Sequence, residues 1–210
     1  MQKLKEEVRR AILNAALKSF KEQGYAAASM RKIAQDAGIA AGNIYRYYSG
    51  KEQLLDAIIG PVFEKCAAYM DEYRRMLDVP LAKERNKKQY FDMVRDTMVG
   101  LFKLHSSEFM ILLNRSEGTR YEHVKNELML FVEKILVDEF RLVRGNREHY
   151  SGQDGALASM LAGTLVEGLS RIIRDHTDTV TIEMLIDRLL DVYNTGIAFV
   201  IEDMRGIERL

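Results

Sequence analysis

Hydroxyl, amide and basic side chains crowd one short stretch near the start of the chain. The stretch runs from Ser29 to Lys51 and contains the run Tyr45-Arg46-Tyr47-Tyr48. Cations and hydroxyl groups bind phosphate oxygens, and an amide such as that of Asn43 can bind the edge of a base. These residue types therefore predict a surface that grips the DNA backbone and reaches into the major groove.

Two short helices joined by a tight turn would position these groups. Ile33 and Ala37 share one face at helical spacing, and Ser29 is a favourable N-cap for the helix that they belong to. Gly38 follows at the place where a helix end prefers a residue free to adopt positive φ. Apolar spacing alone fits any pair of small core helices equally well. The glycine turn and the tyrosine-rich run favour the DNA interpretation.

The order of these residues resembles the N-terminal domain of the TetR family of bacterial transcriptional regulators, over residues 8–55. The resemblance is carried by Ile12-Leu13-Asn14-Ala15-Ala16, Phe20, Gly24-Tyr25, Ile33-Ala34, Ala37-Gly38-Ile39, Gly42-Asn43-Ile44-Tyr45-Arg46-Tyr47-Tyr48, Lys51-Glu52 and Leu54-Leu55. Strand signals are nearly absent from the chain, and its loop breaks predict an all-α fold of about nine helices, which agrees with the resemblance. A three-helix helix-turn-helix DNA-binding domain would occupy residues 1–50, and a helical effector-binding and dimerisation domain would occupy residues 51–210.

The resemblance also implies a DNA-binding surface, with Ser29, Tyr45 and Lys51 on phosphates. The expected members are Ser29, Arg31, Ala41, Gly42, Asn43, Tyr45, Arg46, Tyr47 and Lys51. Arg31 serves either a phosphate or a solvated helix face, and Arg46 serves either a phosphate or the local structure. Where the family often has polar residues this chain has Ala40 and Ala41, which can touch only apolar groups such as a thymine methyl. Hydrogen-bonded base readout therefore falls mostly on Asn43.

The charge of the chain is divided unevenly between its start and the remainder. The whole chain has a formal net charge of zero, but residues 1–51 carry ten basic and four acidic groups, hence +6, which leaves −6 for the rest. A basic head on an acidic body favours attraction to phosphate through one end only, with steep salt dependence.

The apolar pattern of the last helix predicts self-association. Its apolar residues between Ile182 and Ile201 spread over half the circumference, whereas a one-sided surface helix needs a stripe of only about 100°. The preceding helix is rich in small residues. The expected dimer interface comprises Ala158, Ala162, Leu165, Leu189, Tyr193, Gly196 and Val200. The alternative is a helix buried wholly within its own domain. A homodimer would read a palindromic operator in double-stranded DNA, with half-sites about 34–36 Å apart or a multiple of that.

Large, adaptable side chains in the middle of the chain are candidates for an effector pocket. They are Phe63, Met70, Phe91, Met98, Phe102, Phe109, Met110, Leu113, Phe131 and Met160. Met and Phe can line a pliable apolar pocket, but they also fill ordinary cores. The chemical class of the small-molecule effector does not follow from these residues.

Two further local patterns carry predictions about helix ends. Pro61 should kink or break the helix expected from Lys51 to about Met76, either as a hinge between effector and DNA or as a fixed bend. The segments Ser49-Gly50-Lys51-Glu52 and Thr119-Arg120-Tyr121-Glu122 fit capping boxes, the second opening a helix that runs to about Arg144.

Catalysis finds little support in the sequence. Its four histidines form no metal pair, and neither a nucleophile elbow nor a phosphate loop is found. A lone cysteine, Cys66, excludes an internal disulfide and is expected to be a small buried hydrophobe. We expect no cofactor, no metal, no membrane contact and a cytoplasmic location, because no apolar run approaches the roughly 20 residues of a membrane span.

The sequence therefore predicts a ligand-responsive transcriptional repressor that acts as a homodimer. Two alternatives remain at this point. One is a DNA-binding regulator controlled by a protein partner or by no ligand, and the other is a helical enzyme or carrier with an incidental basic head.

Overall fold

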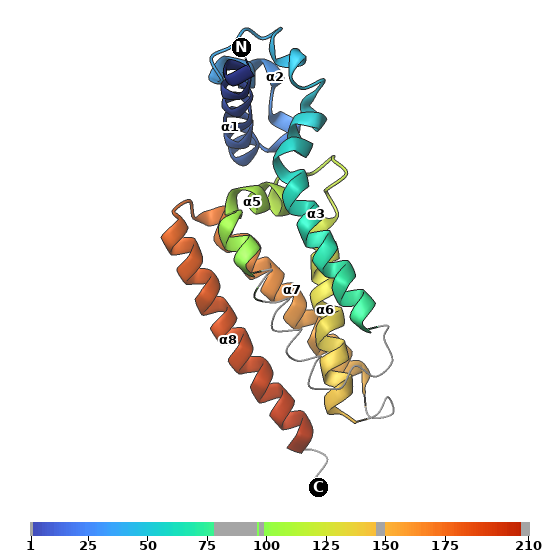
Figure 1. Cartoon of the computed structure of the whole chain (residues 1–210). Helices are drawn as coiled ribbons and strands as arrows, with labels where there is room; N and C mark the ends of the chain where they lie inside the picture. The colour runs from blue at the N-terminus through green and yellow to red at the C-terminus, as the bar shows by residue number, and fades with distance from the viewer. Residues whose placement is uncertain (1, 78–95, 97–98, 146–149, 207–210) are drawn as a thin grey trace. The chain divides into compact units, whose positions relative to one another are not determined.

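The computed structural model describes residues 2–77, 96, 99–145 and 150–206, and these contain helices but no strand (Figure 1). The elements are α1 (Gln2–Ala27), α2 (Met30–Asp36), the 3-10 helix η1 (Ile44–Arg46), α3 (Lys51–Leu77), α5 (Ser106–Asn114), α6 (Val124–Val143), α7 (Gly152–Asp175) and α8 (Thr179–Gly206). Residues 99–104 are helical as well. The all-α prediction is confirmed. The described residues contain these eight elements and the helical residues 99–104, whereas about nine helices were expected over the whole chain.

The chain forms two compact units, which we call unit 1 (Met1–Glu122) and unit 2 (His123–Leu210). This division is one of compactness. The expected boundary after residue 50 is one of function, and it stays a prediction. In unit 1, α1 packs against α2, α3 and α5, and side chains from these helices form a closed core. Its fully buried members include Ile12, Ala16, Phe20, Ile33, Ala34, Leu54, Leu55 and Ile59.

The second helix of the expected helix-turn-helix is shorter than predicted. Gly38 has φ 72° and ends α2, as its position predicted. The chain then makes a turn at residues 41–43 and a three-residue 3-10 helix, η1, instead of an α-helix. Bonds from Asn43 N–H to the Ala40 carbonyl (2.8 Å) and from Tyr47 N–H to the Ile44 carbonyl (2.9 Å) tighten this segment. So few residues lie between the glycine and α3 that tight i to i+3 bonds take the place of a regular helix.

Pro61 does not break α3, which runs from Lys51 to Leu77 without interruption. The prediction of a break is therefore wrong, whereas a kink at Pro61, as a hinge or as a fixed bend, stays a prediction. A proline removes one amide donor, and the remaining bonds of a long helix packed against α1 and α5 outweigh that loss. At the start of α3, Gln53 accepts the Ser49 backbone N–H at 2.6 Å, in place of the expected Glu52.

The second expected capping box lies in a turn instead of at a helix start. The Thr119 hydroxyl donates to the Ser116 carbonyl (2.6 Å) and accepts the Tyr121 N–H (3.1 Å). The Glu122 carboxylate accepts the N–H of Gly118, whose φ is 74°. These bonds close the loop before α6, which begins at Val124, so the prediction was wrong by several residues at this end.

Unit 2 consists of α6, α7 and α8, which pack around one apolar core. This core contains Leu136, Phe140, Ala158, Ala162 and Met204. A true capping box begins α7, where the Ser151 hydroxyl accepts the Asp154 N–H and the Asp154 carboxylate accepts the Ser151 N–H. Burial alone would raise the pKa of Asp154. The bonds from Ser151 and from the Arg144 guanidinium (3.1 Å) outweigh that effect and hold the pKa below its ordinary value.

Helix α7 is long and apolar enough, by length and composition alone, to cross a membrane. The sequence prediction that no run approaches that length is therefore corrected. One such helix is weak evidence for a membrane span, because core helices of soluble proteins pass the same test. The Ala158 and Ala162 face of α7 lies in the core of unit 2, packed with α6 and α8.

Candidate nucleic-acid interface

The residues expected to bind DNA lie on the helix-turn-helix of unit 1, and most of them are exposed. The exposed members are Ser29, Arg31, Ala41, Gly42, Asn43, Tyr45 and Arg46, and the half-buried members are Tyr47 and Lys51. Ile44 and Tyr48 are buried between them and anchor the segment to the core. This alternation presents the polar and cationic groups outward from one short stretch of chain.

Ser29 has the extended backbone of an N-cap at the start of α2, with φ −119° and ψ 126°. Its backbone carbonyl accepts the Ile33 N–H at 2.9 Å, but its hydroxyl makes no capping bond. The position was therefore predicted correctly, while the expected capping bond is absent. An exposed hydroxyl that is not engaged with the helix can donate to a phosphate oxygen.

The segment between Ala41 and Tyr47 carries the candidate base-reading groups. Asn43 precedes η1 with its side chain exposed, and Tyr45 is 57% exposed. Ile44 is fully buried, so the backbone of the segment is fixed while its neighbours project outward. Asn43 held in this way can bind the edge of a base, with Tyr47 expected beside it at the bases, and the Tyr45 hydroxyl can bind a phosphate.

Lys51 has a structural role that the sequence did not reveal. Its ammonium donates to the carbonyls of Ala26 (3.0 Å) and Ala28 (3.1 Å), and it lies 4.5 Å from the centre of the Tyr25 ring. Burial lowers its pKa. Lys51 therefore fixes the connection from α1 to α2, just before Ser29. Its phosphate contact stays a prediction, and it would use the third N–H of the ammonium.

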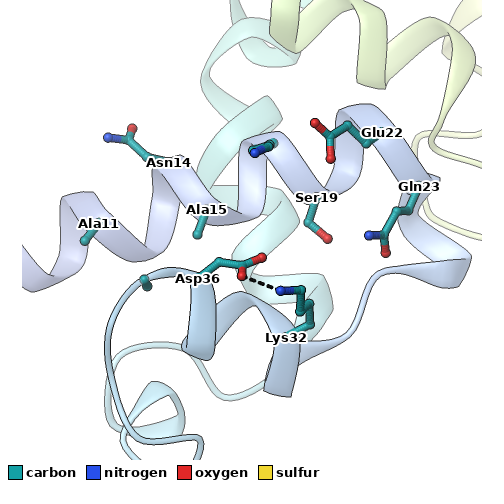
Figure 2. Close-up of a pocket in the computed structure, with 10 residues that line it drawn as sticks. Ala11, Asn14, Ala15, Ser19, Glu22, Gln23, Lys32 and Asp36 are labelled. Atoms are coloured by element: carbon teal, nitrogen blue, oxygen red, sulfur yellow. Dashed lines mark hydrogen bonds and ion pairs between the residues drawn. The ribbon is translucent and has the colours of Figure 1, made fainter.

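A polar groove of about 640 Å³ lies between α1 and α2 (Figure 2). Its lining includes an ion pair between Lys32 and Asp36 at 2.6 Å, and Figure 2 shows Ser19 pointing from α1 toward that side. The Ser19 hydroxyl is buried and makes no hydrogen bond to the described residues. None of the predicted effector-pocket residues lines this groove.

Helix α5 and the residue after it are bonded to the C-terminal end of α1. The Tyr25 N–H donates to the Arg115 carbonyl (3.0 Å), and the Lys21 ammonium donates to the Ser107 hydroxyl (3.1 Å). Gly24 between them has φ 78°, which turns the chain out of the helix. These contacts span about 90 residues of sequence, so no local pattern could indicate them.

A second set of contacts involves the part of α3 that lies close to Pro61. The Tyr121 hydroxyl donates to the Asp56 carboxylate at 2.9 Å, and Arg120 donates to both groups. Tyr121 is buried, with its ring edge-on to Phe63 at 5.2 Å between centroids. Burial raises the pKa of Tyr121, so the hydroxyl keeps its proton at neutral pH. The loop before α6 is thereby attached to the first half of α3.

The residues expected to line an effector pocket divide into several groups. Met70, Phe102, Phe109, Met110, Leu113 and Phe131 are buried, whereas Phe63 is half-buried. Phe102 and Phe109 stack with their centroids 4.0 Å apart, as neighbours in a packed core do. Met160 is 54% exposed on α7, so it is not part of the buried group. Phe91 and Met98 lie outside the described residues. The pocket itself stays a prediction.

The residues expected at a dimer interface also divide. Ala158 and Ala162 are fully buried in the core of unit 2, so they cannot face a second copy, and that part of the prediction is corrected. Small residues here admit neighbours from the same chain. Leu165, Leu189, Tyr193 and Val200 are half-buried, and Gly196 is exposed. Val192 (69% exposed) and Phe199 (72% exposed) of α8 belong to the apolar residues from which self-association was predicted, but they were not among the expected interface residues.

Metal binding and nucleophilic catalysis find little support among the described residues. They contain no group of three or more His, Cys, Asp or Glu placed to hold a metal ion. Cys66 is buried, as expected, and burial raises the pKa of its thiol to about 12. The thiol is therefore protonated and a poor nucleophile at neutral pH.

Comparison with known proteins places this helix-turn-helix among bacterial regulators. Residues 12–58 match the family model described as "Bacterial regulatory proteins, tetR family". The chain is 40% identical over 65 residues to the transcriptional repressor KstR of Mycolicibacterium smegmatis, covering 31% of this chain and 32% of that protein. It is 41% identical over 59 residues to the transcriptional regulator UidR of Escherichia coli, covering 28% of this chain and 30% of that protein. The match thus spans about a third of each relative.

Two solved structures share the fold over nearly the whole chain. One is NalD, the secondary repressor of the MexAB-OprM multidrug efflux pump in Pseudomonas aeruginosa, with TM-score 0.51 and 20% identity over 90% of this chain and 96% of that one. The other is a TetR-like transcriptional regulator from Rhodococcus sp. RHA1, with TM-score 0.52 and 18% identity over 91% and 96%. At these identities the likeness establishes the fold alone.

Proposed function

Since the chain belongs to the TetR family through its N-terminal domain, we propose that it is a transcriptional repressor that binds a palindromic operator as a homodimer and is released by a small-molecule effector. The main support for this proposal is the exposed polar and cationic surface from Ser29 to Lys51, which packs on a closed apolar core. We also propose that the protein is cytoplasmic and is not an enzyme.

The DNA-binding part of the proposal is supported by exposure and charge together. Asn43, Tyr45 and Arg46 project from a backbone that buried Ile44 fixes, and the net charge of residues 1–51 is +6. Phosphates are bound by the hydroxyls and cations at the edges of this surface, and Asn43 reads a base between them. Fixing these groups before binding reduces the entropy lost when the complex forms.

The homodimer is supported by an apolar stripe on α8. Val192 and Phe199 are seven residues apart, which places them on the same helix face, with Gly196 between them. Tyr193, whose hydroxyl contacts the Thr164 hydroxyl of α7, lies beside the stripe. A second copy of this surface would bury it, and each large apolar side chain covered contributes about 1.5–3 kcal/mol. Two-fold symmetry would then present two heads to a symmetric operator.

The response to an effector is supported by the attachment of α5 to α1. The bonds from Tyr25 to Arg115 and from Lys21 to Ser107 link the body of unit 1 to the helix on which the DNA-binding head is built. Met110 and Phe109 on α5 belong to the buried apolar set proposed for the effector. A ligand that shifts α5 would therefore shift α1. A ligand with higher affinity for the shifted state lowers the affinity for DNA.

The experiment that tests the proposed function is selection of bound duplexes from random DNA at low salt. The proposal predicts an inverted repeat among the recovered sequences, and binding that weakens steeply as salt rises. Failure to enrich any sequence would contradict the operator, and a single asymmetric site would contradict the homodimer.

A further inference from the structure

Arg9 of α1 lies against the tyrosine run that follows the base-reading segment. Its Nε donates to the Tyr48 hydroxyl at 3.3 Å, and its guanidinium carbon lies 5.7 Å from the centre of the Tyr48 ring. Figure 1 shows the N-terminal end of α1 beside the chain that follows α2. The contact joins residues 39 positions apart and places a cation of α1 beside the residue that ends the Tyr45–Tyr48 run.

Tyr48 is a rigid support for that guanidinium. It is only 2% exposed, and its backbone N–H donates to the carbonyl of fully buried Ile44 at 3.0 Å. The core of unit 1 therefore fixes the hydroxyl, which in turn fixes one edge of the Arg9 fork. Arg9 itself is exposed. A guanidinium has five N–H donors, so a single bond through Nε leaves the outer edge with its two terminal nitrogens able to bind two oxygens at once.

We propose that Arg9, held in place by Tyr48, is a phosphate-binding residue of the operator complex, gripping the backbone from α1 while Asn43 reads the groove. This inference rests on the proposed function and adds to it a contact from outside the helix-turn-helix. Arginine suits the role because its fork matches the geometry of phosphate oxygens, and immobilising it beforehand lowers the entropy cost of the contact. Glu6, the acidic group that acts on Arg9 electrostatically, lies three residues earlier on α1 and opposes phosphate binding.

The chain offers a matched control at the next position. Arg10 is also exposed on α1 and carries the same charge, but it lies about 100° further round the helix from Arg9. Replacing either arginine removes one positive charge at almost the same place in sequence. Any general effect of net charge on DNA attraction is therefore common to the two variants. Only a directed contact separates them.

The test measures the dissociation constant of the full-length protein for a duplex recovered by selection, as a function of salt. We expect R9A to weaken binding about tenfold and to lower the salt slope by about one per protomer, while R10A changes the constant less than about twofold. Y48F keeps the ring but loses the hydroxyl, and should weaken binding about threefold because the fork is no longer held. E6Q should tighten binding.

Two results would overturn the inference. In one, R9A and R10A are equal in affinity and in salt slope. In the other, R9A lowers the melting temperature and the affinity while the slope is unchanged, which marks a structural role. R9K separates these further, since it retains the charge and should recover part of the slope but not the full affinity. A wild-type protein that binds no duplex at low salt contradicts the proposed function itself, which this experiment therefore distinguishes.

Discussion

Unit 1 and unit 2 expose different kinds of side chain on the helices that carry their proposed contacts. The helix-turn-helix of unit 1 buries Ile33, Ala34 and Ile44 completely and presents hydroxyls, an amide and cations to solvent. Helix α8 of unit 2 buries Ile186 completely but leaves Val192 and Phe199 largely exposed. A polar, cationic surface suits a polyanion, whereas an uncovered apolar stripe suits another protein surface. The two proposed partners, DNA and a second copy of the chain, therefore require surfaces of different chemistry, and the two units supply one each.

The largest expected effect comes from placing charge in the apolar stripe. The double change V192D/F199D should leave a monomer, because two carboxylates on each side of the interface would be buried without partners. Operator affinity should fall at least a hundredfold, since a single head reads too few bases. Sedimentation and DNA titration measure the two effects. Val180, 77% exposed on the same helix but on another face, gives the control V180D, which should remain dimeric. A dimeric double variant would contradict the stripe as interface.

The next effect falls on the DNA surface of unit 1. We expect N43A to lower operator affinity by about 1–3 kcal/mol, because an amide pair with a base is lost, while binding to random duplex stays the same. Y45A should weaken both kinds of binding, because a phosphate contact does not depend on sequence. Fluorescence anisotropy with selected and random duplexes separates these patterns. Equal losses of N43A on both duplexes would sink the assignment of base reading to Asn43.

Lys51 of unit 1 combines a structural role with a proposed phosphate contact, so it tests whether one residue can serve both. K51M should destabilise the domain by about 1–2 kcal/mol, since two backbone carbonyls and the Tyr25 ring lose their cation. Thermal unfolding measures this loss. A variant of unchanged stability with weaker DNA binding would show that Lys51 serves the phosphate alone.

The smallest expected effect is a pH dependence in unit 2. The pKa of Asp154 lies below its ordinary value in the folded chain, so its bonds to Ser151 and Arg144 stabilise unit 2 above about pH 4. That contribution is lost as the pH falls through the folded pKa. D154N should reduce stability at neutral pH by about 1–2 kcal/mol and flatten the acid limb of the stability curve. Acid titrations of wild type and D154N that run parallel would contradict it.

The sequence predicted those features that local patterns determine. Gly38 ends α2 with positive φ because its position after an apolar helix face requires it, and Ser29 takes the N-cap backbone. The capping box at the start of α7 went unpredicted, although Ser151 and Asp154 have its spacing. Thr119 fits the same pattern, yet it closes a turn, because Gly118 and Ser116 offer competing partners. Short motifs fix local bonds and leave open which element they belong to.

Long-range contacts could not be predicted in the same way. Nothing near Lys51 indicates that its ammonium reaches Ala26 and Ala28, and nothing near Arg9 indicates Tyr48. The same limit affected the dimer surface. Small residues such as Ala158 and Ala162 signal close helix packing, but their pattern does not say whether the neighbouring helix belongs to the same chain. The structure assigns these two to the core of unit 2.

The most direct test of the account is the stoichiometry of the complex with a selected duplex. Sedimentation of the protein mixed with that duplex at low salt should give two chains on each duplex that contains both half-sites, and release as salt rises. A chain that remains free of every duplex offered, or that sediments as one copy on a complete site, would contradict the account.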